Sequence, residues 1–329
     1  MSAHTACRSA AASASHSRIR PMSNLSRVIT FATGKGGTGK TSCAANVAGL
    51  AAQAGWRTLL IDLDSQANLG HDLGFSESEG ADHGAHLVNT LVTGGTLTPV
   101  LTGVRTNLDV IPGGSKLDDL EDLVLGRQRR GEDGRILLRE ALAGIADEYD
   151  LIIIDTPPSR RSALVQLALA AARWIVIPTK SDRSSIEGLR VLAEQVVKIR
   201  EINPEIDVLG AVLFGMGASA TARRRFARED VRNVLGDADL LCDSVIRHAE
   251  AAADDAREKG RLIHELAEVV HNAEPYWKAL KEGRRPERIA GSAPALAEDY
   301  VLLADELIRR IGAAEEAAAA PAVQEAATA

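Results

Sequence analysis

The chain has 329 residues, of which 45% are hydrophobic and 25% are charged, an ordinary composition for a globular protein. Its three cysteines have no metal-type spacing, and no apolar stretch approaches the roughly 18 residues that span a bilayer, which excludes a disulfide scaffold and a membrane-spanning chain. Because the formal net charge is −7, a partner bound through charge must meet a local patch on the surface.

The two ends of the chain differ in composition from its centre. Residues 1–27 are rich in Ala and Ser, carry four arginines and contain no acidic residue. We expect a disordered basic tail there, or a start codon assigned too early, since Met22 stands just before the first strand-like run. Residues 313–329 are rich in Ala and Glu and predict a disordered tail at the other end.

Between these tails, strand-like and helix-like segments alternate. The expected strands are 28–33, 58–63, 108–111, 151–154, 174–177, 208–214 and 244–246. The expected helices are 41–54, 131–149, 164–172, 186–202 and 295–311. Apolar strands interleaved with helices are typical of a mostly parallel sheet covered on both faces. The sequence therefore predicts a doubly wound α/β fold in one domain over residues 28–312, with a basic insertion at 272–292 that is a solvated linker or a contact for DNA or a partner.

A glycine-rich loop follows the first strand. Residues Gly34 to Thr41 read G-K-G-G-T-G-K-T, which satisfies the P-loop pattern G-x-x-x-x-G-K-[ST] in its required strand–loop–helix context. Backbone N–H groups of such a loop converge on phosphate oxygens, Lys40 reaches the β- and γ-phosphates, and the Thr41 hydroxyl is a ligand for Mg²⁺. The loop holds a second lysine, Lys35, which can fold back on its own nucleotide, point to solvent or cross to a nucleotide of another copy.

Two of the expected strands end in carboxylates. Asp62 and Asp64 share one face at the end of the second strand, and Asp155 ends the run 151–154. Ligands of doubly wound sheets bind at the carboxyl ends of the strands, where a carboxylate can position an attacking water or support Mg²⁺. The alternative is that these aspartates only form turns or cap helices.

Taken together, three segments resemble the nucleotide motifs of the ParA/Soj branch of the deviant-Walker P-loop ATPases, whose relatives include MinD. They are the lysine-bearing loop, Asp62 to Asn68, and the turn Asp155-Thr156-Pro157-Pro158-Ser159. The resemblance covers roughly residues 26–268 and the final helix, and it implies ATP and Mg²⁺ as cofactors. The residues implied to bind ATP are Gly34, Lys35, Gly36, Gly37, Thr38, Gly39, Lys40, Thr41 and Ser42. The residues implied to be catalytic are Lys35, Lys40 and Asp64, and those implied to hold the metal are Thr41, Asp62 and Asp155.

The same resemblance implies a function. ATP would drive formation of a sandwich homodimer in which Lys35 reaches the phosphates of the partner, and Asp64 would position the hydrolytic water. The dimer would bind nonspecific DNA in the cytoplasm, on the nucleoid, and a ParB-like adaptor would stimulate slow hydrolysis to segregate a plasmid or chromosome. The alternative is a MinD-like or orphan ParA-like ATPase that positions a protein or membrane cargo. We expect no membrane partner, because the polar face of the final helix is mostly acidic. A metabolic P-loop ligase or reductase is a further rival.

A cluster of arginines follows the expected strand 208–214. The residues that could contact DNA are Arg223, Arg224, Arg225, Arg228 and Arg247. Each contact with a phosphate would make binding more salt-dependent. The alternative is a solvated helix face whose arginines pair with Glu229 and Asp230.

Overall fold

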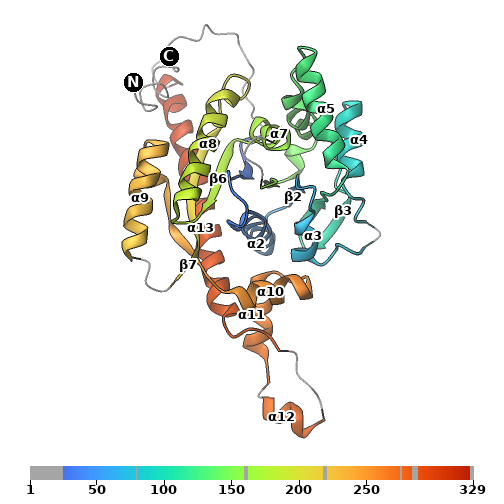
Figure 1. Cartoon of the computed structure of the whole chain (residues 1–329), viewed down its shortest axis with the longest axis vertical. Helices are drawn as coiled ribbons and strands as arrows, with labels where there is room; N and C mark the ends of the chain where they lie inside the picture. Colours follow the sequence, from blue (N-terminus) through green and yellow to red (C-terminus); the bar gives the residue numbers. More distant parts are fainter. Residues whose placement is uncertain are drawn as a thin grey trace.

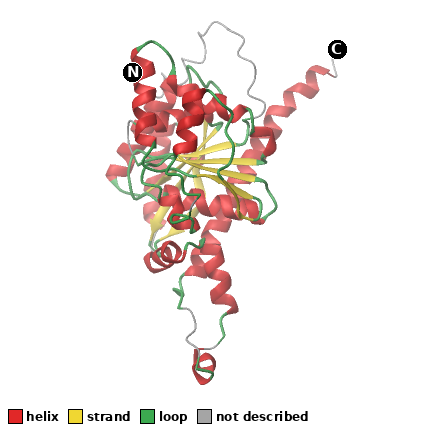
Figure 2. Cartoon of the chain, turned by 90° about the vertical axis from the view of Figure 1, so that its right-hand side faces the viewer, coloured by secondary structure: helices red, strands yellow, loops and turns green. Residues whose placement is uncertain are grey.

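A computed structural model of the chain describes residues 25–78, 80–158, 162–217, 221–274, 276–283 and 288–326. An eight-stranded sheet runs through the centre of the molecule between layers of helices (Figures 1 and 2). In chain order the strands are β1 (Val28–Phe31), β2 (Thr58–Asp62), β3 (Leu101–Arg105), β4 (Leu108–Ile111), β5 (Leu151–Asp155), β6 (Trp174–Thr179), β7 (Asp207–Met216) and β8 (Leu241–Arg247). Their spatial order is β3-β4-β2-β5-β1-β6-β7-β8, and every neighbouring pair is parallel except β3 and β4.

Helices cover both faces of this sheet. The α-helices are α2 (Lys40–Gln53), α3 (Asn68–Leu73), α4 (Ala85–Thr93), α5 (Leu117–Arg129), α6 (Leu137–Ala143), α7 (Ala163–Ala171), α8 (Arg183–Ile199), α9 (Thr221–Leu235), α10 (Glu250–Lys259), α11 (Ile263–Asn272), α12 (Tyr276–Lys281) and α13 (Ala293–Ala326). Short 3₁₀ turns are η2 (Gly134–Ile136), η3 (Ala146–Glu148) and η4 (Ala238–Leu240). Helices α2 and α13 pack on one face, while α5 to α9 pack on the other.

The central strands β1, β2, β5 and β6 are buried on both sides, which explains their apolar runs. In β5, Leu151 and Ile153 belong to the core under α2 and α13, whereas Ile152 and Ile154 belong to the core under α4 to α7. This arrangement confirms the doubly wound α/β fold predicted from the sequence. Within the described part of the chain, no helix is both long and apolar enough to cross a lipid bilayer.

The observed elements differ from the expected ones in several places, of which two are instructive. The single helix expected over 131–149 is wrong: the chain forms η2, α6 and η3 instead. Gly131 adopts a φ of 82°, which ends the preceding helix, and a Cβ at Gly134 would lie 3.1 Å from the backbone of Val124. The strand β3 was not predicted, because it is a partly exposed edge strand that contains Gly103.

The structure can also be compared with the predicted disordered tails and the predicted basic insertion. Residues 313–326, expected to be disordered, continue α13, as an Ala- and Glu-rich composition permits. Glu315 anchors this extension, since Arg27 donates to its two carboxylate oxygens at 2.7 and 2.8 Å. Residues 1–24 of the expected N-terminal tail lie outside the described residues. The basic insertion at 272–292 contains α12, which projects from the body of the molecule beyond α11 (Figure 1).

Candidate functional site

The P-loop connects β1, near the centre of the sheet, to α2. Its backbone passes too close to its neighbours for side chains at two positions. A Cβ at Gly34 would lie 2.5 Å from the carbonyl oxygen of Gly188 in α8. Gly39 has a φ of 79°, and a Cβ there would lie 2.1 Å from the ring of Phe214. Glycine is therefore required at the first position and at the N-cap of α2, and the N-terminus of a helix is a site where backbone N–H groups can bind a phosphate.

Three carboxylates gather beside the loop. The parallel register of β2 and β5 pairs Asp62 directly with Asp155, and Asp64 follows two residues later. Lys40 is 6% exposed; burial lowers the pKa of this lysine, while the charges of Asp155 and Asp64 raise it. The structure thus brings Lys40 and the three predicted aspartates together at the carboxyl ends of β1, β2 and β5, where the fold class places a ligand.

The carboxylates of Asp62 and Asp155 are buried and have few hydrogen-bond partners. Both side chains are at most 1% exposed; one oxygen of Asp62 has no hydrogen-bond partner among the described residues, and Asp155 has none there beyond the Thr41 hydroxyl and the backbone N–H of Thr156. Burial raises the pKa of each carboxyl group. Two buried carboxylates with unsatisfied oxygens beside the Thr41 hydroxyl suit Mg²⁺, which is usually held by one or two carboxylates, nucleotide phosphates and water. No three acidic, His or Cys side chains among the described residues are arranged to hold a metal ion by themselves, so the phosphates would supply the remaining ligands.

Hydrogen bonds fix the direction of the Asp64 side chain. Its backbone N–H donates to Asp62 Oδ1 at 2.8 Å, and its own Oδ1 accepts from the backbone N–H of Gln66 at 3.0 Å. The next helix, α3, begins from Ala67, whose φ of 50° is in the left-handed region. A non-glycine residue there costs roughly 1–2 kcal/mol. The segment after Asp64 is therefore held in a strained turn, a feature often found at functional sites.

Lys35 extends to α8 instead of to the rest of the P-loop. Its Nζ lies 3.1 and 3.2 Å from the two carboxylate oxygens of Asp182, the N-cap of α8. Although burial alone would raise the pKa of Asp182, hydrogen bonds from Ser184, Ser185 and Lys35 hold it well below its usual value. In the single chain, the ammonium group is therefore paired with a carboxylate of its own chain.

Asp182 is a site residue that the sequence analysis missed. It lies 147 positions from Lys35, so no local pattern connects the two. The available signal was Asp182 followed by two serines, Ser184 and Ser185, which is typical of a helix start. A second missed residue is Asp72 in α3, whose Oδ2 accepts from the Ser42 hydroxyl at 3.5 Å and whose Oδ1 pairs with Arg257 at 3.2 Å. Through these two contacts, Asp72 connects Ser42 at the start of α2 to Arg257 in α10.

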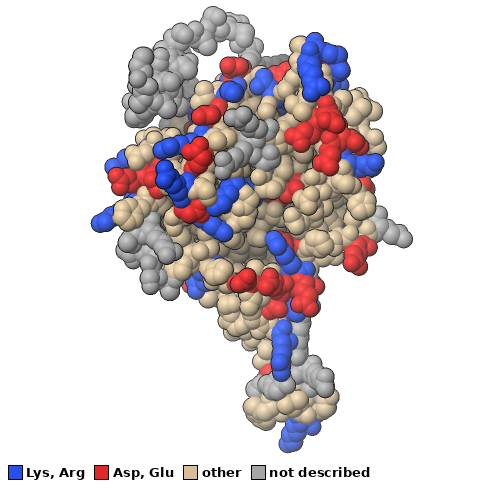
Figure 3. Space-filling model, in the orientation of Figure 1, with Lys and Arg blue, Asp and Glu red and all other residues tan. Residues whose placement is uncertain are grey.

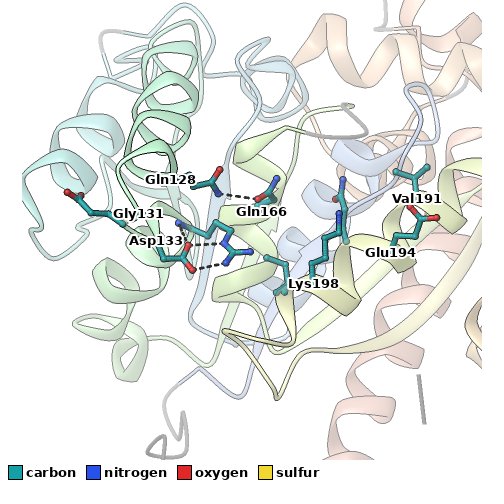
Figure 4. Close-up of a pocket in the computed structure, with 11 residues that line it drawn as sticks. Gln128, Gly131, Asp133, Gln166, Val191, Glu194 and Lys198 are labelled. Carbon is teal, nitrogen blue, oxygen red and sulfur yellow. Dashed lines mark hydrogen bonds and ion pairs between the residues drawn. The ribbon is translucent and has the colours of Figure 1, made fainter. Parts of the chain in front are cut away.

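A cavity of about 230 Å³ opens beside the start of α2. Its lining is mostly apolar and includes Ser42, Phe214, Ala249, Leu262 and Tyr300. A larger cavity, of about 740 Å³, lies between α5, α7 and α8 (Figure 4). None of the predicted nucleotide-site residues lines it. The smaller cavity therefore meets the predicted nucleotide site at Ser42, whereas the larger one does not.

The structure pairs three of the predicted DNA-binding arginines with acidic residues of the same chain. Arg224 contacts Asp243 at 2.8 Å, and Arg228 lies 3.8 Å from the same carboxylate. Arg247 donates to both oxygens of Asp299 at 2.6 and 2.7 Å. The expected partners Glu229 and Asp230 take no part in these pairs. Arg225 lies over the ring of Phe226 instead, and the side chain of Arg223 is outside the described residues.

Comparison with known proteins agrees with this site. A family model described as an AAA domain matches residues 26–208, more than half of the chain and all three nucleotide motifs. The chromosome partitioning protein ParA of Myxococcus xanthus is 34% identical over 220 residues, 66% of this chain and 73% of that protein. ParA of Caulobacter vibrioides is 31% identical over 272 residues, 80% of this chain and 96% of that protein.

A solved structure shares the fold. McdA from Cyanothece in complex with ATP aligns with a TM-score of 0.64 at 20% identity, over 87% of this chain and 96% of that chain. At this identity the likeness shows the fold alone. The family model and the sequence relatives go further: the model spans the glycine-rich loop and both aspartate segments, and the two ParA proteins are 31–34% identical, so the chain belongs to the ParA/Soj family of P-loop ATPases.

Proposed function

We propose that this protein is an ATP-dependent switch that partitions DNA. ATP binds with Mg²⁺ at the P-loop, and two copies close around their nucleotides into a sandwich dimer. The dimer binds DNA without sequence preference, and hydrolysis, stimulated by a ParB-like adaptor, ends the bound state. The homology to chromosome partitioning proteins supports the class of function. The observation that carries the dimer step is the position of Lys35.

Lys35 lies at a surface position from which it can exchange Asp182 for the nucleotide phosphates of a second copy. The side chains of Lys35 and Asp182 are 32% and 43% exposed, so the pair lies at the surface beside the P-loop. An exposed ion pair contributes about 0.2–1 kcal/mol, so little free energy is needed to break it. A triphosphate carries several negative charges and is a stronger partner for an ammonium group than one exposed carboxylate. The pair with Asp182 is thus an exchangeable contact, suited to a lysine that acts across a dimer.

The remaining residues divide the chemistry of hydrolysis among themselves. Lys40 and the backbone of Gly36 to Thr41 hold the phosphates, and Asp64 orients the attacking water. Thr41, Asp62 and Asp155 would hold Mg²⁺, which neutralises phosphate charge when bound. In this proposal, the base of the same nucleotide binds in the small apolar cavity beside Ser42. Hydrolysis is slow in this proposal because the bound state must last long enough to act as a timer.

Binding to nonspecific duplex DNA, measured across a salt series, tests the proposal. We expect steep, salt-sensitive binding with ATP, and weak binding with ADP or without nucleotide. Equal binding in all three states would contradict the switch, because the nucleotide would then have no effect on the affinity for DNA. Absence of binding in every state would contradict the DNA cargo and leave the ATPase assignment intact.

A second candidate is an ATPase of the same family that positions a protein cargo. The observation in its favour is that Arg224, Arg228 and Arg247 are paired with acidic residues of the chain itself. These arginines therefore form no unpaired cationic patch. The salt series separates the two candidates, since a protein cargo requires no affinity for DNA.

A further inference from the structure

The insertion before α13 forms an arm that stands away from the body of the molecule. Helix α11 packs along the start of α13, and α12 lies at the far end of the arm (Figures 1 and 2). The return segment is tied to α10, because the backbone N–H of Ala290 donates to Asp255 Oδ2 at 2.7 Å. Ala279 in α12 is fully buried, so one face of this short helix packs inward and the others project.

The outward faces of α12 carry two kinds of side chain. Trp277 is 70% exposed, more than any other large apolar side chain in the described residues, and Leu280 is 49% exposed. Lys278 and Lys281 are exposed as well, and neither ammonium group has an ion-pair or hydrogen-bond partner within the described part of the chain. Figure 3 shows basic side chains along the arm and at its tip, below an acidic band on the body. We call these four residues the arm tip.

The charges of the arm tip contrast with those of the predicted arginine cluster. Arg224, Arg228 and Arg247 have carboxylates of their own chain within 4 Å, so a phosphate must compete with Asp243 or Asp299 for them. Among the described residues, Lys278 and Lys281 have no such competitor. On a molecule with a formal net charge of −7, unpaired cations on a projecting element are the groups that can reach a polyanion while the acidic body stays further away.

We propose that the arm tip is a surface by which the ATP-bound protein contacts the phosphate backbone of duplex DNA; this inference rests on the proposed function. Lys278 and Lys281 each neutralise a phosphate, and Trp277 packs its indole against the sugars or into the minor groove, as exposed apolar side chains of DNA-bending proteins do. Such contacts read no base sequence, which suits binding anywhere along a chromosome or plasmid.

The test is the salt dependence of DNA binding with ATP. Each phosphate contact adds about 0.9 to the slope of log K against log salt concentration. We expect Lys278→Ala/Lys281→Ala to lower the slope by about 1.8 for one arm on the DNA, and by twice that if both arms of a dimer bind. Because both side chains are exposed and unpaired, the variant should keep the circular dichroism spectrum and unfolding midpoint of the wild type.

Two matched variants separate position from charge. Lys278→Arg/Lys281→Arg keeps the cations on the arm tip and should keep the wild-type slope. Lys116→Ala/Arg129→Ala removes two cations from the start and end of α5, away from the arm, and should leave the slope nearly unchanged (Figure 1). An unchanged slope in the arm variant would overturn the inference, as would an equal loss in the α5 variant. If the wild type itself fails to bind DNA with ATP, the proposed function fails first.

The fluorescence of Trp277 gives a second readout. The other tryptophans are less accessible: Trp174 is 7% exposed, and Trp56 is partly buried beneath Arg27. Iodide should quench Trp277, and added duplex DNA should protect it from quenching, with the signal assigned by Trp277→Phe. A blue shift with phosphatidylserine–phosphatidylcholine vesicles, together with no protection by DNA, would overturn the inference in favour of a lipid surface.

Discussion

The ion pair between Lys35 and Asp182 predicts how tightly two copies associate. If Lys35 crosses to the nucleotide of a second copy, it must first leave Asp182, so a loss of charge at this carboxylate favours the dimer. Asparagine is the appropriate substitution, since Asp182 also caps α8 by accepting from the backbone N–H of Ser185 at 2.9 Å. The amide oxygen of asparagine accepts the same bond.

The expected size of the effect follows from the exposure of the pair. With side chains that are 32% and 43% exposed, the pair contributes about 0.2–1 kcal/mol. A dimer breaks two such pairs, which corresponds to about 0.4–2 kcal/mol. The dissociation constant of the ATP-bound dimer should therefore be about twofold to thirtyfold lower in Asp182→Asn than in the wild type.

Sedimentation equilibrium with a non-hydrolysable ATP analogue and Mg²⁺ measures this constant directly. Glu315→Gln is the matched control, because its pair with Arg27 has similar exposure, 34% and 41%, at another place on the surface. We expect no change in dimer affinity for the control, nor for Asp182→Asn with ADP. A dissociation constant that is unchanged or higher in Asp182→Asn would refute the idea that Asp182 competes for Lys35.

Four further substitutions test other parts of the site and the fold. Lys35→Ala should keep binding of a fluorescent ATP analogue but lose ATP-dependent dimerisation and hydrolysis, and normal turnover would remove Lys35 from its role. Asp64→Ala should accumulate ATP-bound dimer in gel filtration, because ATP still binds without being hydrolysed; normal phosphate release would place the water elsewhere. Gly39→Ala should weaken nucleotide binding by more than about tenfold, since the left-handed φ alone costs roughly 1–2 kcal/mol and the new Cβ meets Phe214; wild-type affinity would show that the loop adjusts. Glu306 is buried, and its pKa lies below the usual value because hydrogen bonds from Ser244 and from backbone N–H groups outweigh desolvation. The contribution of its charge to the stability of the fold is therefore present above pH ~4.3 and is lost as the pH falls further. Glu306→Gln should cost about 1–3 kcal/mol at pH 7 in urea unfolding, and less near pH 3; an equal cost at both values would contradict this role for the charge.

The sequence contained enough information to predict the sheet and to place Asp62 and Asp155 at one edge of it. Each strand under two helical layers is a continuous apolar run, and such runs are readable without knowledge of the neighbours. The carboxylates of Asp62 and Asp155 could be placed together because both end parallel strands, and the register then pairs them directly. The edge strand β3 escaped prediction, because its exposed residues and Gly103 carry no apolar pattern.

What could not be predicted depends on contacts between distant parts of the chain. Arg247 pairs with Asp299, 52 positions later, and Lys35 pairs with Asp182, 147 positions later. No local spacing rule joins such residues. The extension of α13 was missed for a related reason: Ala- and Glu-rich residues are compatible with either a disordered tail or a helix, and the contact from Arg27 to Glu315 lies outside any local window.

The close approach of Gly34 and Gly188 has a mechanical consequence. A Cβ at Gly34 would lie 2.5 Å from the carbonyl oxygen of Gly188, and a Cβ at Gly188 would lie 3.2 Å from the carbonyl carbon of Gly34. Backbone meets backbone there, with no flexible side chain between them to absorb a displacement. A displacement of the first turns of α8 towards the phosphate loop would therefore require the loop to move as well.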